Sequence, residues 1–456
     1  MKNIITLAAM SIFCCCALFG VLLFAGCGKS TNQLDTNWTL PVTASSSIGS
    51  LGGWVNLHRC RDTIIGIGVH GDSSPYGLIL NPDHKSWSNL SFAVVPKGYV
   101  WSYAAIDSHS QNILSAEGYA ENEQVVMKSI LGEMTYRGLR NIREVQWITD
   151  KTSLLGKTDE NIKINSSGEG RQDIGLGVGL LSDQDAYIPF SIDAAEVTQQ
   201  GKSITIDTTK GPFVNGVFHS TDSGKTWQME KISDHRAIGP EMRKTLGYVY
   251  YIAGIYPLWA SRKAVDADKW EEPQSITKTF SMQGWFAAAA EGDIIHICWM
   301  DRRHNKWRFN IDGPPIENDD IYYCRRRDSD SNWSKDILLS KGLEYCYPPS
   351  ISAEGQNVVI VWAGIQSADK HHSEYDPNDI YYVASKDGGH TWSRPLKVTD
   401  TAKDGIVSGK PKVVLLNGII HLLYTQGKFQ NPAQLSPGLT RLNQLPWPIY
   451  YTQRPF

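Results

Sequence analysis

Two turns about 160 residues apart repeat one eight-residue pattern, STDSGKTW at 220–227 and SKDGGHTW at 385–392. Each has a glycine, which adopts positive φ at the least cost, and an aspartate that can accept hydrogen bonds from the backbone of its own turn. Both runs end in tryptophan, the largest apolar side chain. We therefore expect each tryptophan ring to fold back into a core, and each turn to be one unit of a repeated architecture.

The residues around these turns are repeated as well. Asp-Ile-Tyr-Tyr occurs at 320–323 and 379–382, and in both places a polar turn, Trp-Ser and an alternating strand pattern follow. Two more strand patterns precede each copy, at 284–301 and 349–364, and a third copy of that pair lies at 410–426. Four short strands in succession, recurring roughly every 45 to 75 residues, are typical of β-propeller blades.

The rest of the chain can be divided on the same pattern. Strand patterns at 63–95, 186–232 and 246–276 give three more units, whereas 99–150 has strand patterns without the turn signature. We therefore predict an all-β propeller with seven four-stranded antiparallel blades, or six if 99–150 is an insertion. The aromatic content of 10% and the 40 glycines agree with a β fold rich in turns.

The last unit lacks a fourth strand, because the chain ends in IYYTQRPF directly after the third strand pattern. Near the other end, NWTLPVT at 37–43 matches TWSRPLKVT at 391–399, the fourth strand of the preceding unit. An open ring would leave exposed strand edges. We therefore predict that residues 37–43 close the ring as the fourth strand of the last blade.

The two turns resemble Asp boxes, the bacterial neuraminidase repeats of sialidases and related propellers. With its degenerate copies, the resemblance covers roughly residues 37–456. It implies a sialidase-like β-propeller whose Asp boxes are structural and lie on the face opposite the active site. The residues that it makes structural are Ser220, Asp222, Gly224, Thr226, Trp227, Ser385, Asp387, Gly389, Thr391, Trp392, Asp328 and Trp333.

The sequence departs from sialidases at the positions that carry their chemistry. That family binds the substrate carboxylate with three arginines and uses a tyrosine nucleophile with a glutamate, together with an aspartate acid/base. Its first arginine lies in an Arg-Ile-Pro stretch, which does not occur here, and Arg59 and Arg61 lie out of register. Sialidase activity is therefore an alternative and not our first expectation.

Four long insertions, at 193–213, 301–319, 364–379 and 427–447, fall between the second and third strands of their blades. This strand order puts all four on the face opposite the Asp boxes, where long loops are commonly functional. The catalytic candidates in and near them are Asp301, Arg302, Arg303, His304, Glu344 and Tyr345. The ligand-binding candidates are Arg236, Trp307, Arg308, His371, His372 and Glu374. The spacing in HHSEYD is not that of a metal site, so we expect no metal and no cofactor.

The N-terminus is typical of an exported lipoprotein. Lys2 precedes an apolar run at 5–25, and LFAGC resembles a lipobox, with cleavage before Cys27 and lipidation of that residue. The alternative is an uncleaved membrane anchor helix. We expect a signal peptide at 1–26, a tether at 27–36 and one propeller domain at 37–456. Gly28 after the cysteine favours the outer membrane or cell surface, if the organism is Gram-negative.

Charge and cysteine content exclude other classes of partner and site. The net charge of −3 does not favour nucleic-acid binding, and we expect a monomer. Four cysteines lie beyond the N-terminal segment, namely Cys60, Cys298, Cys324 and Cys346, without metal-ligand spacing. Cys298 and Cys324 fall on neighbouring strand patterns, so either a disulfide or two buried thiols is compatible with the sequence.

Three functions remain. The first is recognition of a glycan, an acidic sugar above all, or of an envelope protein. Arginines pair with carboxylates, and aromatic rings stack on the apolar faces of sugars. The second is a carbohydrate-active enzyme, either a divergent exo-α-sialidase or other glycoside hydrolase, or a polysaccharide lyase. The third is a non-catalytic scaffold.

Overall fold

The chain forms two compact units, Met1–Gln33 and Leu34–Phe456, and the second contains the folded elements described below. The computed structural model describes residues 33–45, 55–69, 75–90, 104–107, 112–121, 124–135, 138–150, 162–164, 171–173, 175–182, 184–200, 203–207, 213–235, 237, 239–254, 257–277, 285–303, 319–343, 345–366, 377–428 and 448–456. Within these ranges no helix is long and apolar enough to cross a membrane. The predicted signal peptide and Cys27 lie outside the described residues.

The described part of the second unit consists of β-strands and one short 3-10 helix, η2 (Ala402–Asp404). The strands form seven antiparallel sheets, which we call blades 1 to 7 in chain order. Blade 1 contains β2 (Asn56–Cys60), β3 (Thr63–Val69), β4 (Pro75–Leu80) and β5 (Trp87–Leu90). Blade 2 contains β6 (Ala105–Ile106), β7 (Asn112–Glu121), β8 (Gln124–Thr135), β9 (Gly138–Asp150) and β11 (Arg171–Asp173). Blade 3 contains β10 (Ile162–Ile164), β12 (Gly175–Leu176), β13 (Leu180–Ser182), β14 (Asp185–Gln200), β15 (Ser203–Asp207), β16 (Phe213–Ser220) and β17 (Gln228–Ser233).

Blades 4 to 7 are more regular. Blade 4 contains β18 (Glu241–Lys244), β19 (Tyr248–Ala253), β20 (Trp259–Ala264) and β21 (Gln274–Ser275), and blade 5 contains β22 (Phe286–Glu291), β23 (Ile294–Asp301), β24 (Asp320–Arg327) and β25 (Ile337–Leu338). Blade 6 contains β26 (Tyr345–Cys346), β27 (Ser350–Glu354), β28 (Asn357–Ile365), β29 (Asp379–Ser385) and β30 (Leu396–Lys397). Blade 7 contains β31 (Val407–Leu416), β32 (Ile419–Gly427), β33 (Ile449–Pro455) and β1 (Val42–Ser45). The stretch 99–150 is therefore blade 2, and the prediction of seven blades is confirmed.

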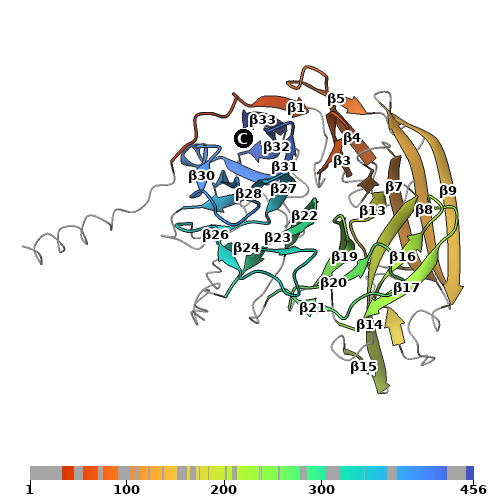
Figure 1. Ribbon diagram of the computed structural model, residues 1–456. Coiled ribbons are helices and arrows are strands. Elements are labelled where there is room, and N and C mark those ends of the chain that lie inside the picture. Colours follow the sequence, from red (N-terminus) through yellow and green to blue (C-terminus); the bar gives the residue numbers. More distant parts are fainter. Residues whose placement is uncertain are drawn as a thin grey trace, which may run out of the picture. The chain divides into compact units, whose positions relative to one another are not determined.

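The innermost strands of the blades form a closed ring. Contacts run in order from β2 to β6, β13, β18, β22, β27 and β31, and β31 contacts β2 again. Figure 1 labels four of these inner strands, β13, β22, β27 and β31. Side chains of one blade also satisfy the strand edge of the next. Ser350 and Ser352 in β27 accept hydrogen bonds from the backbone N–H groups of Val413 (3.2 Å) and Leu415 (2.9 Å) in β31. These bonds pair inner edges that no neighbouring strand covers.

The N-terminal segment closes the ring, as predicted, although its strand begins later than expected. In β1, Val42 pairs with Tyr451 of β33, which makes β1 the outermost strand of blade 7. The prediction put the strand at 37–43, whereas it spans Val42–Ser45. Pro41 directly precedes it and has no N–H to donate to a ladder. Residues before Pro41 still run beside blade 7, since Thr39 N donates to the Gln453 carbonyl at 2.9 Å.

Tryptophans fill the junctions between blades. The buried apolar residues form seven clusters, one at each junction between neighbouring blades. Six of these clusters contain a tryptophan from the fourth-strand side of one blade, packed against the preceding blade: Trp38, Trp87, Trp227, Trp270, Trp333 and Trp392. We expected each ring to fold back into a core, and the ring is indeed packed in one. It lies between blades because each sheet buries both of its faces against neighbours.

The two Asp-box turns have the same hydrogen bonds. Asp222 Oδ1 accepts from the N–H groups of Lys225 and Thr226, both at 2.9 Å, and Asp387 Oδ1 accepts from His390 (3.0 Å) and Thr391 (2.9 Å). The threonine hydroxyls donate to the second carboxylate oxygens. These bonds hold the pKa of both carboxyls well below their usual range. Gly224 and Gly389 have φ of 73° and 84°.

Two degenerate copies of the turn behave differently. Asp83 accepts from Lys85 N (2.9 Å) and Ser86 N (3.0 Å), so it supports its own turn as in an Asp box. Asp328 instead accepts from Thr245 Oγ1 (2.6 Å) and Gly247 N (2.8 Å), which belong to the first turn of blade 4. Asp328 therefore links two blades.

Cys298 and Cys324 are buried free thiols. In the pairing of β23 with β24, Cys298 lies opposite Tyr323 and Cys324 opposite Ile297. The one-residue offset points the two side chains to opposite faces of the sheet. Accordingly, Cys298 packs at the junction of blades 5 and 6, and Cys324 at that of blades 4 and 5.

Candidate functional site: a basic central channel

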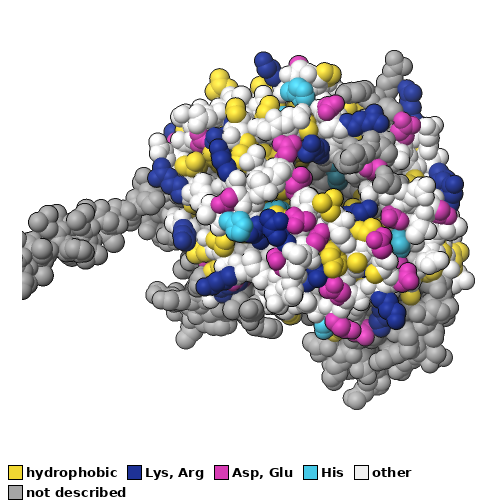
Figure 2. Space-filling view, in the orientation of Figure 1, with side chains coloured by type: hydrophobic (Ala, Val, Ile, Leu, Met, Phe, Trp, Pro, Cys, Tyr) yellow, Lys and Arg dark blue, Asp and Glu magenta, His cyan; other side chains and the backbone are white. Residues whose placement is uncertain are grey.

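The seven inner strands surround a cavity of about 1650 Å³. This volume exceeds the roughly 300–1,000 Å³ of a small-molecule pocket. The cavity is lined by more basic than acidic residues, namely Arg59, Arg61, Arg243, Lys244, Arg302, Lys410 and Lys412 against Asp62, Glu241 and Glu291. The whole chain has a net charge of −3, and acidic and basic side chains are mixed over the face seen in Figure 2. The positive charge is therefore a property of the channel.

Strand direction fixes the depth of each residue in the channel. Every inner strand begins at the loop face, defined here as the face where the second strand of a blade leads into the third. It ends at the turn face, where the Asp-box turns 220–227 and 385–392 lie. Residues at the start of inner strands therefore lie at the loop-face mouth, and residues such as Glu291 and Glu354, which end β22 and β27, lie towards the turn face.

Three basic residues from three blades lie midway along the channel: His58 of β2, Arg243 of β18 and Lys412 of β31. Burial, followed by the positive charges of Arg243 and Lys412, lowers the pKa of His58 to about 4. Burial, followed by the charge of Arg243, lowers the pKa of Lys412 to about 8. These effects require the three groups to lie within electrostatic reach of one another.

The Arg243 side chain is held in place by its own blade and the next. Its Nε donates to the Ala288 carbonyl of β22 at 2.8 Å, Nη1 donates to the Met242 carbonyl at 2.7 Å, and Nη2 pairs with Glu241. The side chain is still 26% exposed. Since inner strands surround Arg243, this exposure is to the water of the channel.

A bulge in β31 shapes the opposite wall. The register with β32 shifts between Gly409 and Lys412, and Lys410 has a φ of 50° before Pro411. Positive φ at a lysine is costly, and bulges of this kind re-aim side chains next to binding sites. Lys410 and Lys412 both line the cavity.

Aromatic rings and a guanidinium group line the loop-face mouth. Tyr345 and Tyr347 pack edge-to-face, with ring centroids 4.9 Å apart, and Trp285 is 51% exposed. Arg302 is oriented by buried Asp319, with Nε–Oδ1 at 2.5 Å and Nη2–Oδ2 at 3.3 Å. The mouth thus offers flat apolar surfaces beside an oriented cation.

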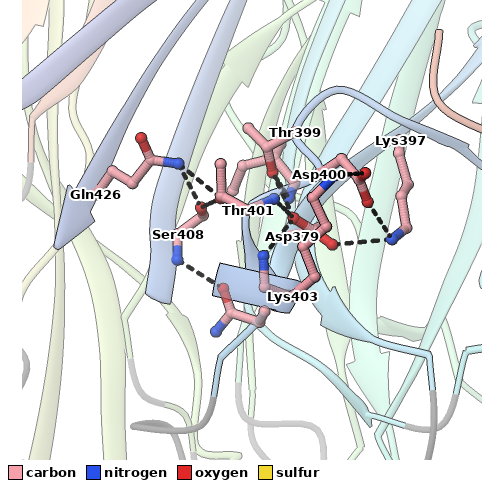
Figure 3. A network of polar contacts seen from close by, with 11 residues as sticks. Asp379, Lys397, Thr399, Asp400, Thr401, Lys403, Ser408 and Gln426 are labelled. Atoms are coloured by element: carbon pink, nitrogen blue, oxygen red, sulfur yellow. Dashed lines mark hydrogen bonds and ion pairs between the residues drawn. The ribbon is translucent and has the colours of Figure 1, made fainter. Parts of the chain in front are cut away.

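A network around Asp379 orders the mouth between blades 6 and 7 (Figure 3). Asp379 Oδ1 accepts from Thr399 Oγ1 (3.0 Å) and Thr401 N (2.8 Å), and its Oδ2 accepts from Lys397 Nζ (3.0 Å). Next to it, the Asn378 side chain accepts a bond from Ser408 N at 2.9 Å. Asn378 and Ser408 both line the cavity, so the network fixes two polar groups at its rim.

The structure divides the predicted catalytic residues. Arg302 and Tyr345 line the channel. Asp301 and Arg303 do not, because Asp301 is fully buried and accepts bonds from Arg303 Nε (3.0 Å), Arg303 Nη2 (2.6 Å) and Trp299 Nε1 (3.0 Å). The remaining candidates lie outside the described residues: His304, Glu344, Arg236, Trp307, Arg308, His371, His372 and Glu374.

The predicted insertion at 193–213 forms, where described, the end of β14 and the strand β15 that pairs back onto it. This hairpin extends blade 3 on the loop face. The other three insertions lie mostly outside the described residues. In the described part of the chain, no group of three His, Cys, Asp or Glu side chains is placed to hold a metal ion.

Sequence analysis missed the residues at the centre of the channel. His58, Arg243 and Lys412 stand in the first strands of their blades, in NLHRC, EMRK and KPKVV. A signal was available, because basic residues interrupt strands that are otherwise expected to be apolar.

Fold and cavity together define a seven-bladed β-propeller with a basic central channel. No family model and no curated protein matches the chain. Solved structures that resemble it include the NanB sialidase from Streptococcus pneumoniae (10% identity, TM-score 0.41, 94% of this chain and 72% of that chain covered), Trypanosoma rangeli sialidase (8%, 0.41, 92% and 58%) and YCF48 bound to D1 peptide (12%, 0.43, 92% and 97%). These similarities are weak, and they carry no evidence on function.

Proposed function

We propose that this protein binds an acidic carbohydrate in the central channel, which the ligand enters from the loop face. The observation that carries the proposal is the cluster of Arg243 and Lys412 inside a cavity of about 1650 Å³ with a basic lining. A ligand that brings carboxylates would form charge-assisted hydrogen bonds with these cations. An oligosaccharide also suits a volume larger than a small-molecule pocket.

The mouth supports a sugar as the ligand. Tyr345 and Tyr347 offer aromatic surface, and Arg302 offers a guanidinium that can pair with a carboxylate. An acidic lining would instead favour a cation.

The arrangement supports binding more than sialidase chemistry. Arg59 pairs with Glu354 towards the turn face, and Arg302 pairs with Asp319 at the loop-face mouth. Arg243 alone of the described arginines lies at the centre. Three arginines at three depths are poorly placed to hold one carboxylate.

Binding of uronic-acid oligosaccharides and of neutral oligosaccharides of equal length to the purified full-length protein tests the proposal. We expect the acidic ligands to bind, with an affinity that falls as salt rises. Lys412→Met should weaken binding about tenfold or more, as expected for the loss of one charge-assisted contact. Lys225→Met removes one exposed charge on the turn face and should leave binding unchanged. Equal binding of neutral ligands would refute the proposal, and product release would point to an enzyme.

We further propose that the propeller is exported and held at the cell envelope through lipidated Cys27. The lipobox-like LFAGC carries this proposal. Metabolic labelling with a fatty acid should mark the wild type and leave Cys27→Ser unlabelled. Equal labelling of both would rule out this anchor.

A further inference from the structure

We propose that the middle of the channel holds an oxyanion-binding site formed by His58, Arg243 and Lys412. This inference deepens the proposed function and rests on it for one point, the source of the anion. The site itself stands on the placement of three side chains, of which the proposed function already uses Arg243 and Lys412.

The three residues surround the channel axis. Lys412 and His58 stand on β31 and β2, which contact each other in the ring. Arg243 stands on β18, which is separated from β2 by β6 and β13, and from β31 by β22 and β27. Arg243 therefore faces the other two residues across the channel, and a ligand on the axis lies between them.

His58 provides an unused polar atom at this place. Its Nε2 is removed from solvent and has no hydrogen-bond partner among the described residues. His58 itself lines the cavity, and no group in the described part of the chain competes for its Nε2. A neutral imidazole can donate one hydrogen bond to an anion oxygen.

Arg243 is built to present its remaining donors. A guanidinium has five N–H groups, and the three contacts to Ala288, Met242 and Glu241 use one on each nitrogen. One N–H then remains on each terminal nitrogen, on a side chain that is fixed and still partly exposed to the channel. Two such donors match the two oxygens of a carboxylate, sulfate or phosphate.

The local charge favours an anion. Among the described residues, seven lysines and arginines line the channel against three carboxylates, and His58 beside them is neutral, so the lining has an excess of positive charge. An oxyanion on the axis would offset part of that charge. Its source is either the carboxylate of a bound acidic sugar or a free inorganic anion, since both present the same oxygens.

Sulfate, titrated against chloride at constant ionic strength, tests the site without any sugar. We expect a saturable rise of the thermal unfolding midpoint of the full-length protein and a shift of the His58 ring signals in NMR spectra. Lys412→Met should weaken the apparent affinity at least about tenfold, Lys412→Arg should retain it, and the turn-face control Lys225→Met should match the wild type. Lys412→Met removes a buried charge, so we expect this variant to fold. Lys412→Arg keeps the positive charge, so its affinity for sulfate tests the site without removing that charge.

The outcomes separate this site from the proposed function. No saturable response to sulfate, or an equal response in Lys412→Met, overturns the oxyanion site even if acidic sugars bind. A sulfate response without sugar binding supports the site and overturns the proposed function. If both ligands bind, competition between them assigns the site to the sugar carboxylate, and independent binding assigns it to a free inorganic anion.

Discussion

Trp38, near the start of the described chain, packs edge-on against Tyr382 of blade 6, with ring centroids 5.4 Å apart. The neighbouring Asp35 accepts a hydrogen bond from the Tyr382 hydroxyl at 2.5 Å and pairs with Arg454 of β33. The N-terminal segment thus joins blade 6 to the C-terminal strand of blade 7. Trp38 thus fills the junction between blade 7 and blade 6. In most other blades, the tryptophan at this place comes from the blade's own chain segment.

Trp38→Ala tests the importance of this closure. The ring is partly buried, so its loss should cost about 2–3 kcal/mol, below the 3–5 kcal/mol of a fully buried tryptophan. Leu40→Ala is a control from the same segment, because Leu40 is 89% exposed. Urea denaturation of both variants measures the difference. An equal stability of the two would show that the N-terminal plug does not stabilise the ring.

Gly389→Ala tests the packing of an Asp box against its neighbour. Gly389 has a φ of 84°, and a Cβ there would lie 1.9 Å from the Tyr323 hydroxyl. Gly342 has nearly the same φ, 85°, with nothing within 4 Å of an added Cβ. Gly342→Ala should therefore cost about 1 kcal/mol, which is the backbone cost alone. Gly389→Ala should cost at least 2 kcal/mol more, because the clash adds to it. Similar costs would mean that the two blades do not meet as described.

His296 makes stability depend on acid pH. It is buried, its Nδ1 lies 2.8 Å from the Tyr323 hydroxyl, and burial lowers its pKa to about 3 from 6.5. Between these values the unfolded chain binds a proton that the folded chain does not, so stability falls as pH falls from 6.5 to 3. The loss should be about 3–5 kcal/mol. His296→Gln should be less stable at pH 7 but should lose less between pH 7 and 4, and an unchanged pH dependence would contradict this.

Lys412 makes the stability of the ligand-free protein depend on pH in the alkaline range. Its folded pKa of about 8 lies below the unfolded 10.5, so the unfolded chain binds more protons between these values and stability rises with pH over this range. The gain should be about 1–3 kcal/mol, since channel water moderates it. Lys412→Met should be more stable at pH 7 and should lack the rise, whereas Lys225→Met should keep it. A rise that survives Lys412→Met would belong to another group.

The fold could be predicted because its signals are local and repeated. Turn chemistry at Asp222 and Asp387, and the recurrence of Asp-Ile-Tyr-Tyr, depend only on neighbours in the sequence. Asp379, the aspartate of the second Asp-Ile-Tyr-Tyr copy, also orders the channel mouth. Its position in a strand pattern did not reveal this second role. The tryptophans were predicted to be buried, but their partners depend on how whole blades pack.

The centre of the site could not be predicted because the channel is made by seven strands that are far apart in sequence. Arg243 lies across the channel from His58 and Lys412 only because blade 4 stands across the ring from blades 1 and 7. Asp301 illustrates the converse, a residue whose surroundings the sequence did not reveal. It belongs to a polar stretch that looks functional, yet its carboxylate is fully used by Arg303 and Trp299.

A crystal structure of the full-length protein with a bound uronic-acid oligosaccharide tests acidic-sugar binding in the channel most directly. We predict that one sugar carboxylate lies within hydrogen-bond distance of Arg243 and Lys412, with another sugar ring against Tyr345 or Tyr347 at the loop-face mouth. An oligosaccharide bound on the turn face or outside the ring, with only water between Arg243 and Lys412, would contradict it.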